Sequence, residues 1–227
     1  MNRILVVAAH PDDEILGVGA TVAKHKDNGD IVQCLILGEG QTSRFSNREV
    51  VEKKILDELH TDTLIAAEKI GYDVVEFADF PDNRFDQVDL LEIVKVIEHK
   101  INEYRPSIIY THYMNDLNID HQYTYRAVIT ATRPINNCSV KEIYAFETLS
   151  STEWSFGKDK SFTPSVFIDI ENYIEVKKEA MRCYSTELCE YPHPRSLEGI
   201  DILAKSRGLV IGKRFAEAFE CIRKIID

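Results

Sequence analysis

Cysteine is scarce in this sequence, and its spacing is irregular. The chain has 5 cysteines, an odd number, and no two of them form a CxxC arrangement. Disulfide frameworks and thiolate zinc sites need paired or regularly spaced cysteines. We therefore expect reduced thiols that serve packing, and no structural site built from them.

Long hydrophobic runs and excess positive charge are also missing. No stretch approaches the roughly 18 apolar residues of a membrane span, and the first apolar run, Ile4 to Ala9, is too short for a signal peptide. The chain has 27 Lys and Arg against 38 Asp and Glu, a formal net charge of −11. A broad basic surface for nucleic acid or anionic membrane is thereby excluded. The expectation is a soluble, cytoplasmic protein with no membrane span and no nucleic-acid partner.

The hydrophobic pattern predicts an α/β fold. The chain has 227 residues, of which 44% are hydrophobic, and β-branched apolar runs alternate with longer amphipathic segments, as in a parallel sheet covered by crossover helices. Strands are expected at residues 3–9, 31–37, 74–77, 107–111, 140–146 and 166–170. Helices are expected at 14–28, in a long segment ending near 71, and at 86–104, 119–132, 173–184 and 195–207.

We interpret residues 1–227 as one domain. Residues 1–146 would form the sheet, and residues 147–227 a C-terminal annex that packs on it, joined by a stretch rich in Ser, Thr, Gly and Lys up to Pro164. Gly17-Val18-Gly19 lacks the full G-x-G-x-x-G string, so a nicotinamide cofactor is not expected.

The densest polar cluster is His10-Pro11-Asp12-Asp13-Glu14, which follows the first predicted strand. Pro and acidic residues suit the first turn of a helix, so capping is the simplest interpretation. Capping leaves His10 unexplained, as well as two adjacent carboxylates at the strand end where α/β sheets bind ligands. A metal ion would relieve the repulsion between those carboxylates.

A second cluster, residues 111–121, follows the fourth predicted strand and ends at His121, where a helix is expected to begin. The first and fourth strands of a doubly wound sheet are often neighbours, so the two clusters would converge on one cation. Carboxylate oxygen with imidazole nitrogen suits Zn²⁺, or Fe²⁺ in an arrangement of two histidines and one carboxylate.

These two segments resemble the LmbE/PIG-L-like family of zinc-dependent N-acetylglucosaminyl deacetylases. The resemblance rests on Ala9-His10-Pro11-Asp12-Asp13-Glu14 and on Asn115-Asp116-Leu117-Asn118-Ile119-Asp120-His121. Weaker similarity extends over nearly the whole chain. It implies a Rossmann-like, mostly parallel sheet with helices on both faces and a C-terminal extension.

The resemblance also implies roles for individual residues. His10, Asp13 and His121 match the family's zinc ligands, and Asp12 matches its general base. Many relatives carry a His three residues before the last ligand, where this chain has Asn118. An amide donates a hydrogen bond to an oxyanion but delivers no proton at neutral pH, so an acid role would have to move elsewhere.

Six further residues are candidates for roles at or near the site. Asp120 would orient a ligand imidazole or cap a helix. His112 and Asp116 would line the pocket, with His112 also a candidate acid, or His112 would be a strand-end histidine with a backbone partner. Arg84 would bind a phosphate or sugar hydroxyl, or form a surface ion pair. His193 and Arg195 would reach the site from the annex or serve a structural loop.

The two clusters together with the family resemblance imply a metal-dependent hydrolase that removes acetyl from an N-acetylated amino sugar. Its partner would be a small-molecule N-acetyl sugar conjugate, and the sequence leaves a homo-oligomer open. The alternatives are an amidase or esterase of the same fold acting on a non-sugar acyl group, and a non-catalytic sugar- or nucleotide-binding protein. Specificity would lie in the loops at 39–47 and 147–164.

Overall fold

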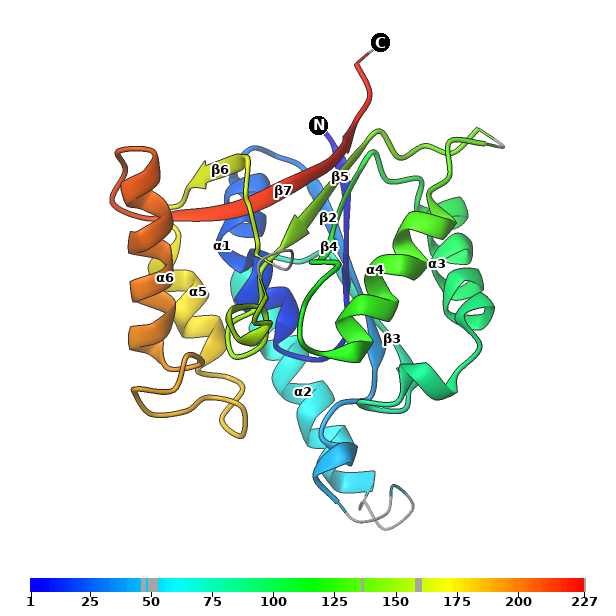
Figure 1. The fold of residues 1–227 in the computed structure, drawn as a ribbon, viewed down its shortest axis with the longest axis horizontal. Helices are drawn as coiled ribbons and strands as arrows, with labels where there is room; N and C mark the ends of the chain where they lie inside the picture. Colours follow the sequence, from blue (N-terminus) through cyan, green and yellow to red (C-terminus); the bar gives the residue numbers. More distant parts are fainter. Residues whose placement is uncertain (46–47, 49–52, 136, 158–160, 227) are drawn as a thin grey trace.

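Seven strands form one sheet in the computed structural model of the chain, which describes residues 1–45, 48, 53–135, 137–157 and 161–226 (Figure 1). The strand order is β3-β2-β1-β4-β5-β7-β6. The first five strands run parallel, and β7 pairs antiparallel with both β5 and β6. The expected α/β fold with a mostly parallel sheet is thus confirmed.

The helices and strands up to residue 210 follow the predicted order along the chain, whereas the last strand was not predicted. In order they are β1 (Arg3–Ala8), α1 (Asp13–Asp27), β2 (Ile31–Gly38), η1 (Thr42–Arg44), α2 (Lys53–Ile70), β3 (Val74–Phe80), η3 (Phe85–Gln87), α3 (Leu90–Tyr104), β4 (Ile108–His112), α4 (Ile119–Ala131), β5 (Glu142–Phe146), η4 (Thr152–Trp154), β6 (Val166–Asp169), α5 (Ile174–Met181), α6 (Leu197–Val210) and β7 (Ala216–Lys224). No helix within the described ranges has both the length and the apolar content needed to cross a membrane.

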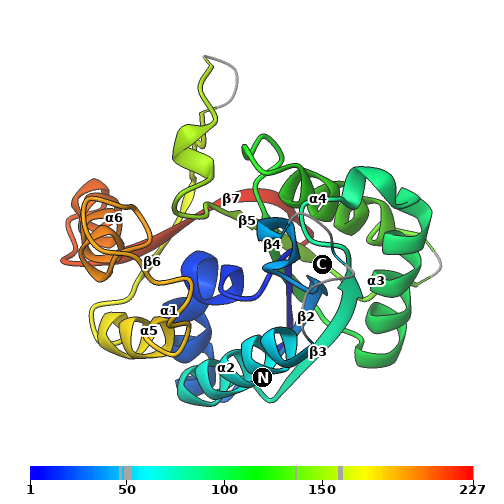
Figure 2. The ribbon, with the colours of Figure 1, turned by 90° about the horizontal axis from the view of Figure 1, so that it is seen from below.

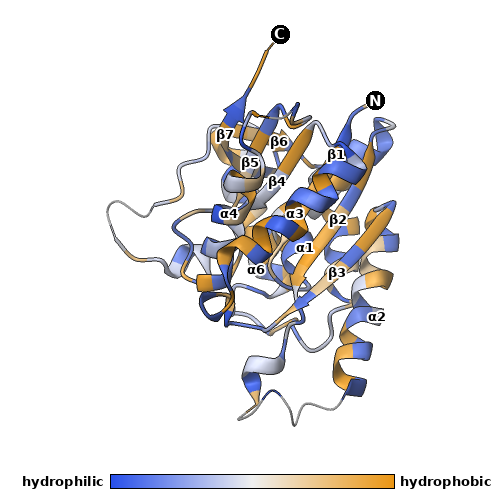
Figure 3. Ribbon diagram, turned by 90° about the vertical axis from the view of Figure 1, so that its right-hand side faces the viewer, coloured by the Kyte–Doolittle hydropathy of each residue, from blue (hydrophilic) through white to orange (hydrophobic). Residues whose placement is uncertain are grey.

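Helices cover both faces of the sheet, and the strand period of two decides which side chains meet them. In β1, Ile4, Val6 and Ala8 pack with α1, α2, α5 and α6, whereas Leu5 and Val7 face α3 and α4. Figure 2 shows these two groups of helices on opposite sides of the sheet. A strand buried on both faces has to be apolar throughout, which is why β1 reads as a continuous hydrophobic run. The strands are accordingly mainly orange in Figure 3, whereas α2 alternates in colour.

The C-terminal part of the chain differs from the prediction in two respects, because β7 was not predicted and because the annex joins the sheet. The annex was expected to pack on the sheet, but its strands β6 and β7 extend the sheet beyond β5. The sequence of β7 begins Ala-Glu-Ala-Phe-Glu, which has few β-branched residues and high helix propensity. Pairing with β5 overrides that local preference.

Gly17 is a point of close packing between α1 and β5. A Cβ atom at Gly17 would lie 2.2 Å from Cδ2 of the buried Phe146 ring, whereas a Cβ at Gly19 would make only ordinary contacts at 3.4 Å or more. The two positions therefore form a matched pair on one helix.

We expect Gly17→Ala to lower the free energy of unfolding by about 1–3 kcal/mol, because the Phe146 ring has to move in a filled core. Gly19→Ala should leave stability unchanged or raise it, by up to about 1 kcal/mol, through helix propensity. Urea denaturation of both variants measures this. Equal stability of the two variants would contradict the packing argument.

Candidate metal and catalytic site

The two polar clusters meet at the carboxyl edge of the sheet. Strands β1 and β4 are parallel neighbours, with Ile4 opposite Ile108 and Val6 opposite Tyr110. The loop after β1 carries His10, and the segment after β4 leads into α4, where His121 lies in the first turn. The predicted convergence is confirmed at the point where the strand order reverses, which is the usual ligand-binding place in such sheets.

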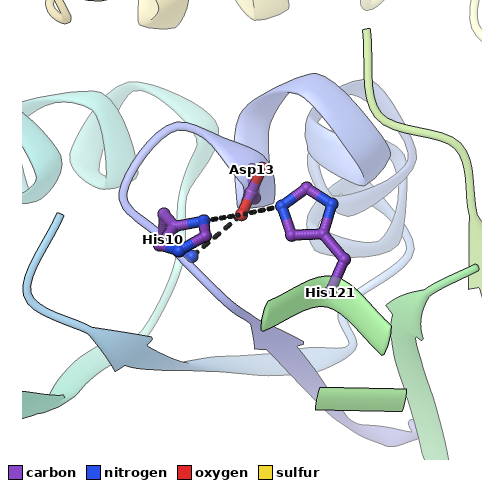
Figure 4. A group of neighbouring side chains, drawn as sticks. All are labelled: His10, Asp13 and His121. Atoms are coloured by element: carbon purple, nitrogen blue, oxygen red, sulfur yellow. Dashed lines mark hydrogen bonds and ion pairs between the residues drawn. The ribbon is translucent and has the colours of Figure 1, made fainter. Parts of the chain in front are cut away.

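His10, Asp13 and His121 form a compact donor set (Figure 4). Asp13 Oδ2 lies 3.4 Å from Nδ1 of His10 and 3.3 Å from Nε2 of His121. One ligand atom from each residue lies within 4.8 Å of the others, and all three residues are buried or nearly so. Two imidazole nitrogens and a carboxylate oxygen at this spacing fit the three protein ligands of a catalytic zinc or iron site.

Each imidazole has a second carboxylate on its other nitrogen. Nε2 of His10 lies 2.9 Å from Asp120 Oδ2, whose partner oxygen accepts a 2.9 Å hydrogen bond from the Phe85 N–H. Nδ1 of His121 lies 3.1 Å from Asp116 Oδ1, a contact whose alignment falls short of a hydrogen bond. Carboxylates in these positions orient both rings so that the nitrogens facing Asp13 would offer their lone pairs once a metal replaces the protons.

The same carboxylates set the charge of the cluster. Burial opposes a positive charge on His121, but Asp13 and Asp116 raise its pKa to about 9. Burial likewise disfavours ionisation of Asp116, yet His121 and the neighbouring hydroxyls lower its pKa to about 2. The geometry thus favours positive charge between buried carboxylates, which a divalent cation would supply.

Asp120 and Asp116 orient the imidazoles rather than contacting the cavity. The expectation that Asp120 orients a ligand imidazole agrees with its contact to His10. Capping of α4 falls to Asn118, whose Oδ1 accepts a 2.8 Å hydrogen bond from the Asp120 N–H. The substrate-binding interpretation of Asp116 is wrong in this geometry, because its carboxylate is buried and accepts bonds from Ser151 and Thr152.

His112 also lies behind the site. Its Nε2 accepts a 2.9 Å hydrogen bond from the Ala9 N–H, and its ring stacks on His121 with centroids 3.9 Å apart. Burial lowers the pKa of His112 to about 4, so the ring is neutral. The interpretations of His112 as a pocket residue or as the missing acid are therefore wrong, and the backbone partner is the correct alternative.

Asp12 stands apart from the donor set. It adopts a left-handed backbone conformation with φ 97°, which Asp tolerates better than most residues. Its Oδ2 accepts a 3.1 Å hydrogen bond from Nη1 of Arg195. Burial raises the pKa of the Asp12 carboxyl well above its usual value, and the carboxylates of Asp13 and Glu187 add to this while Arg195 opposes it.

Glu14 fixes the backbone of that turn. Its Oε2 accepts a 3.0 Å hydrogen bond from the Asp12 N–H, and its Oε1 accepts one from the hydroxyl of Tyr184 in the annex. Burial raises the pKa of Glu14 to about 7. A strained backbone held from two sides in this way is typical of functional positions.

A cavity of about 270 Å³ opens over the donor set. Most of its walls are polar, and they come from residues 10–16, the loop after β2, helix α2, the loops before η3 and α4, the first turn of α4, and the loops of the annex. The lining residues are His10, Pro11, Asp12, Asp13, Leu16, Gly40, Gln41, Ser43, Arg44, Leu59, Asp82, Asn83, Asn118, His121, Thr148, Leu149, Ser150, Ser151, Glu187 and Arg195. Both loops expected to carry specificity thus contribute, although residues 46–47 and 158–160 lie outside the described ranges.

Arg84 does not reach this cavity. The loop after β3 turns at Asn83, which has φ 52°, so that Asp82 and Asn83 face the cavity and Arg84 is exposed. This geometry gives no support to its predicted contact with a substrate phosphate or hydroxyl, which stays a prediction. Asp82 was missed, although its place after a strand at the same edge was a usable signal.

Arg195 and Glu187 are the other residues that sequence reasoning undervalued. Arg195 bonds Glu187 at 2.8 Å as well as Asp12. Of its two predicted roles, reaching the site from the annex agrees with the contact to Asp12. Nothing local marks either residue, because the annex reaches the site only through the tertiary fold.

Comparison with known proteins agrees with this architecture. Residues 5–132 match the family described as PIG-L: GlcNAc-PI de-N-acetylase. The diacetylchitobiose deacetylase of Thermococcus kodakarensis is 25% identical over 236 residues, covering 98% of this chain and 84% of that protein. The 4-oxalmesaconate hydratase of Pseudomonas putida is 28% identical over 207 residues, covering 82% of this chain and 75% of that protein.

A solved structure has the same fold. The N,N'-diacetylchitobiose deacetylase from Pyrococcus horikoshii aligns with a TM-score of 0.78 at 17% identity, covering 98% of this chain and 84% of that chain. The family match spans more than half of the chain and contains both loops that carry the donor set. This chain therefore belongs to the PIG-L family of GlcNAc-PI de-N-acetylases.

Proposed function

We propose that the protein is a metal-dependent hydrolase that removes the acetyl group from an N-acetylated amino sugar. The observation that carries the proposal is the donor set of His10, Asp13 and His121 at the base of a polar cavity, with Asp12 on the wall beside it. The deacetylase relative acts, by its name, on an N-acetylated sugar. Membership of the family supports the same chemistry.

His10, Asp13 and His121 would hold the metal, Zn²⁺ or Fe²⁺. When bound, such an ion lowers the pKa of a coordinated water and polarises a carbonyl group. The chain fits the ion because the carboxylates of Asp120 and Asp116 fix both imidazoles, and because three ligands leave a coordination position open.

Asp12 is the proposed general base. It borders the cavity next to Asp13, but its carboxylate is held by Arg195 rather than by an imidazole. That arrangement leaves it free to accept a proton from the attacking water and to return it to the departing amine. Burial raises the pKa of the Asp12 carboxyl well above its usual value, which makes the carboxylate a stronger base for the proton that it accepts.

Asn118 is the proposed hydrogen-bond donor to the oxyanion. Its Oδ1 is occupied by the cap of α4, which fixes the amide so that Nδ2 faces the cavity rim and donates to Asn83 Oδ1 at 3.1 Å. An amide held in this way has its orientation set before the substrate binds. Substrate oxygen would compete with Asn83 for that donor.

The alternatives differ in what they require of Asp12 and of the substrate. A binding protein needs no base, whereas Asp12 is held in a strained turn beside the donor set. An amidase or esterase would use the same residues on another acyl group. The relative named as a hydratase makes water addition a further reaction to test. Acetate release from N,N'-diacetylchitobiose distinguishes the proposed activity from these.

Removal of the metal should abolish acetate release. The carbonyl and the water would then lose their activation, and restoring Zn²⁺ or Fe²⁺ should return the rate. The measurement is acetate formed by chelator-treated and reloaded protein, with circular dichroism to verify that the fold persists. Full turnover by protein shown to be metal-free would contradict the proposal.

Replacing Asp12 should slow turnover without removing the metal. Asp12→Asn keeps the size of the side chain and tolerates the left-handed backbone. We expect kcat to fall about 10²- to 10⁴-fold, the usual size of acid–base assistance, at unchanged metal content. The control is Asp89→Asn, whose side chain makes no capping bond at the start of α3. Unchanged kcat in Asp12→Asn would end the assignment of Asp12 as base.

The carboxylate of Asp120, which contacts Nε2 of His10, should raise the affinity of the site for a metal. Asp120→Asn removes the charge that orients the ring, and we expect the affinity for Zn²⁺ to drop about 10- to 100-fold. Competition with a chromogenic chelator measures the constant. If affinity stays at the parent value, the contact between Asp120 and His10 has no role in holding the metal.

A further inference from the structure

The exposed aromatic side chains are not spread over the surface. In the described part of the chain, the exposed Phe, Tyr and Trp residues are Phe45, Trp154, Phe156 and Tyr191. All four belong to the loops that also supply walls of the cavity: Phe45 follows Arg44, Trp154 and Phe156 follow Ser151, and Tyr191 lies between Glu187 and Arg195. We call these four residues the aromatic rim.

Trp154 is the best-anchored member of the aromatic rim. It ends the short helix η4, on a segment that projects from the body of the molecule (Figure 2). The turn is fixed because the N–H groups of Ser150 and Ser151 donate to the Glu153 carboxylate at 2.6 and 3.2 Å. Thr152 donates to Asp116, the carboxylate behind His121. The turn that carries Trp154 is therefore held at a fixed position relative to His10, Asp13 and His121.

A second connection joins Trp154 to the other wall of the cavity. Its ring meets His193 edge to face, with centroids 5.9 Å apart. Nδ1 of His193 accepts a 3.1 Å hydrogen bond from the Arg195 N–H, and Arg195 holds Asp12. Even so, the Trp154 side chain keeps 38% of its surface exposed. The indole thus remains partly open to solvent, although Thr152 and His193 beside it are both hydrogen-bonded to residues of the site.

Cavity size and composition indicate what this open ring contacts. A volume of about 270 Å³ is at the small end of ligand pockets, so a substrate longer than one amino sugar extends past the mouth. The aromatic residues stand singly among polar ones, with Glu153 and Ser155 on either side of Trp154 and Glu190 beside Tyr191. A lipid or apolar protein partner would need a continuous apolar patch. A sugar ring presents an apolar C–H face and a hydroxyl edge, which matches aromatic residues among polar groups.

We infer that Trp154 is the stacking platform of a second saccharide subsite, which holds the sugar joined to the ring that loses its acetyl group. This inference rests on the proposed function, which it narrows to substrates with at least two sugar rings. The reacting ring occupies the cavity, and the next ring packs on the indole outside it.

Trp154 is the only tryptophan of the chain, so the protein contains its own probe. In Asp12→Asn protein loaded with Zn²⁺, we expect N,N'-diacetylchitobiose to change the tryptophan emission in a saturable manner. N-acetylglucosamine at saturation should leave the emission nearly unchanged. Emission that stays constant while the parent enzyme releases acetate from the disaccharide overturns the subsite and leaves the proposed function intact. A change without acetate release from the parent enzyme refutes the deacetylase and with it the role of Trp154 beside a reacting ring, and leaves only disaccharide binding at Trp154.

The octyl glycoside of N-acetylglucosamine tests whether Trp154 binds an apolar chain as well as it binds a second sugar ring. A response to it equal to that of the disaccharide overturns a saccharide subsite, as does an equal response to the monosaccharide. If neither saccharide is bound nor deacetylated, both the subsite and the proposed function fail.

Kinetics of the parent enzyme provide the second measurement. Trp154→Ala should lower kcat/KM for the disaccharide about five- to tenfold, the size expected for one lost aromatic contact, through KM rather than kcat. The kcat/KM of the same variant for N-acetylglucosamine should stay within about twofold of the parent value. Trp154→Phe should restore most of the loss, and the control Leu209→Ala, at an exposed position on α6, should match the parent. Equal losses on both sugars, or none on either, overturn the inference.

Discussion

The carboxylate of Asp13 between two buried imidazoles is the interaction on which the site depends. A buried carboxylate is costly unless charged or hydrogen-bonding partners surround it. His10 and His121 provide those partners, and Asp120 and Asp116 in turn compensate the imidazoles. Because every group is held by another, the rings are fixed before any ion binds, and the cluster as a whole favours a cation at its centre.

The fold creates this cluster by placing two strand ends side by side. β1 and β4 are about a hundred residues apart in sequence but pair in parallel where the sheet order reverses. Each strand ends in a histidine-containing segment, and each is followed by a helix whose first turn carries a ligand. Apolar side chains pack against β1 on both faces and hold the strand in place. The loop that follows β1 can therefore bear the backbone strain at Asp12.

The C-terminal region completes the site and is tied to α1 by buried polar contacts. Nζ of Lys177 donates to Glu217 at 2.6 Å and to the Leu16 carbonyl at 2.7 Å, close to the turn that carries Asp12. Tyr184 and Arg195 reach that turn directly. The annex therefore does more than extend the sheet: it holds the proposed base and forms one wall of the cavity.

The sequence by itself determined the α/β class, the order of the first five strands along the chain, and two polar clusters at strand ends of one sheet edge, residues 10–14 and 111–121; the ligand set of His10, Asp13 and His121 was implied by the family resemblance. The strands and helices follow from local hydrophobic periodicity. The two clusters are visible because their polar residues directly follow predicted strands. The tertiary structure alone decided that His112 and Asp116 face away from the cavity, and that Arg84 points to solvent. It also decided that β7 is a strand and that Arg195 meets Asp12. Side-chain direction and contacts between distant segments depend on packing around the whole sheet, which no local pattern encodes.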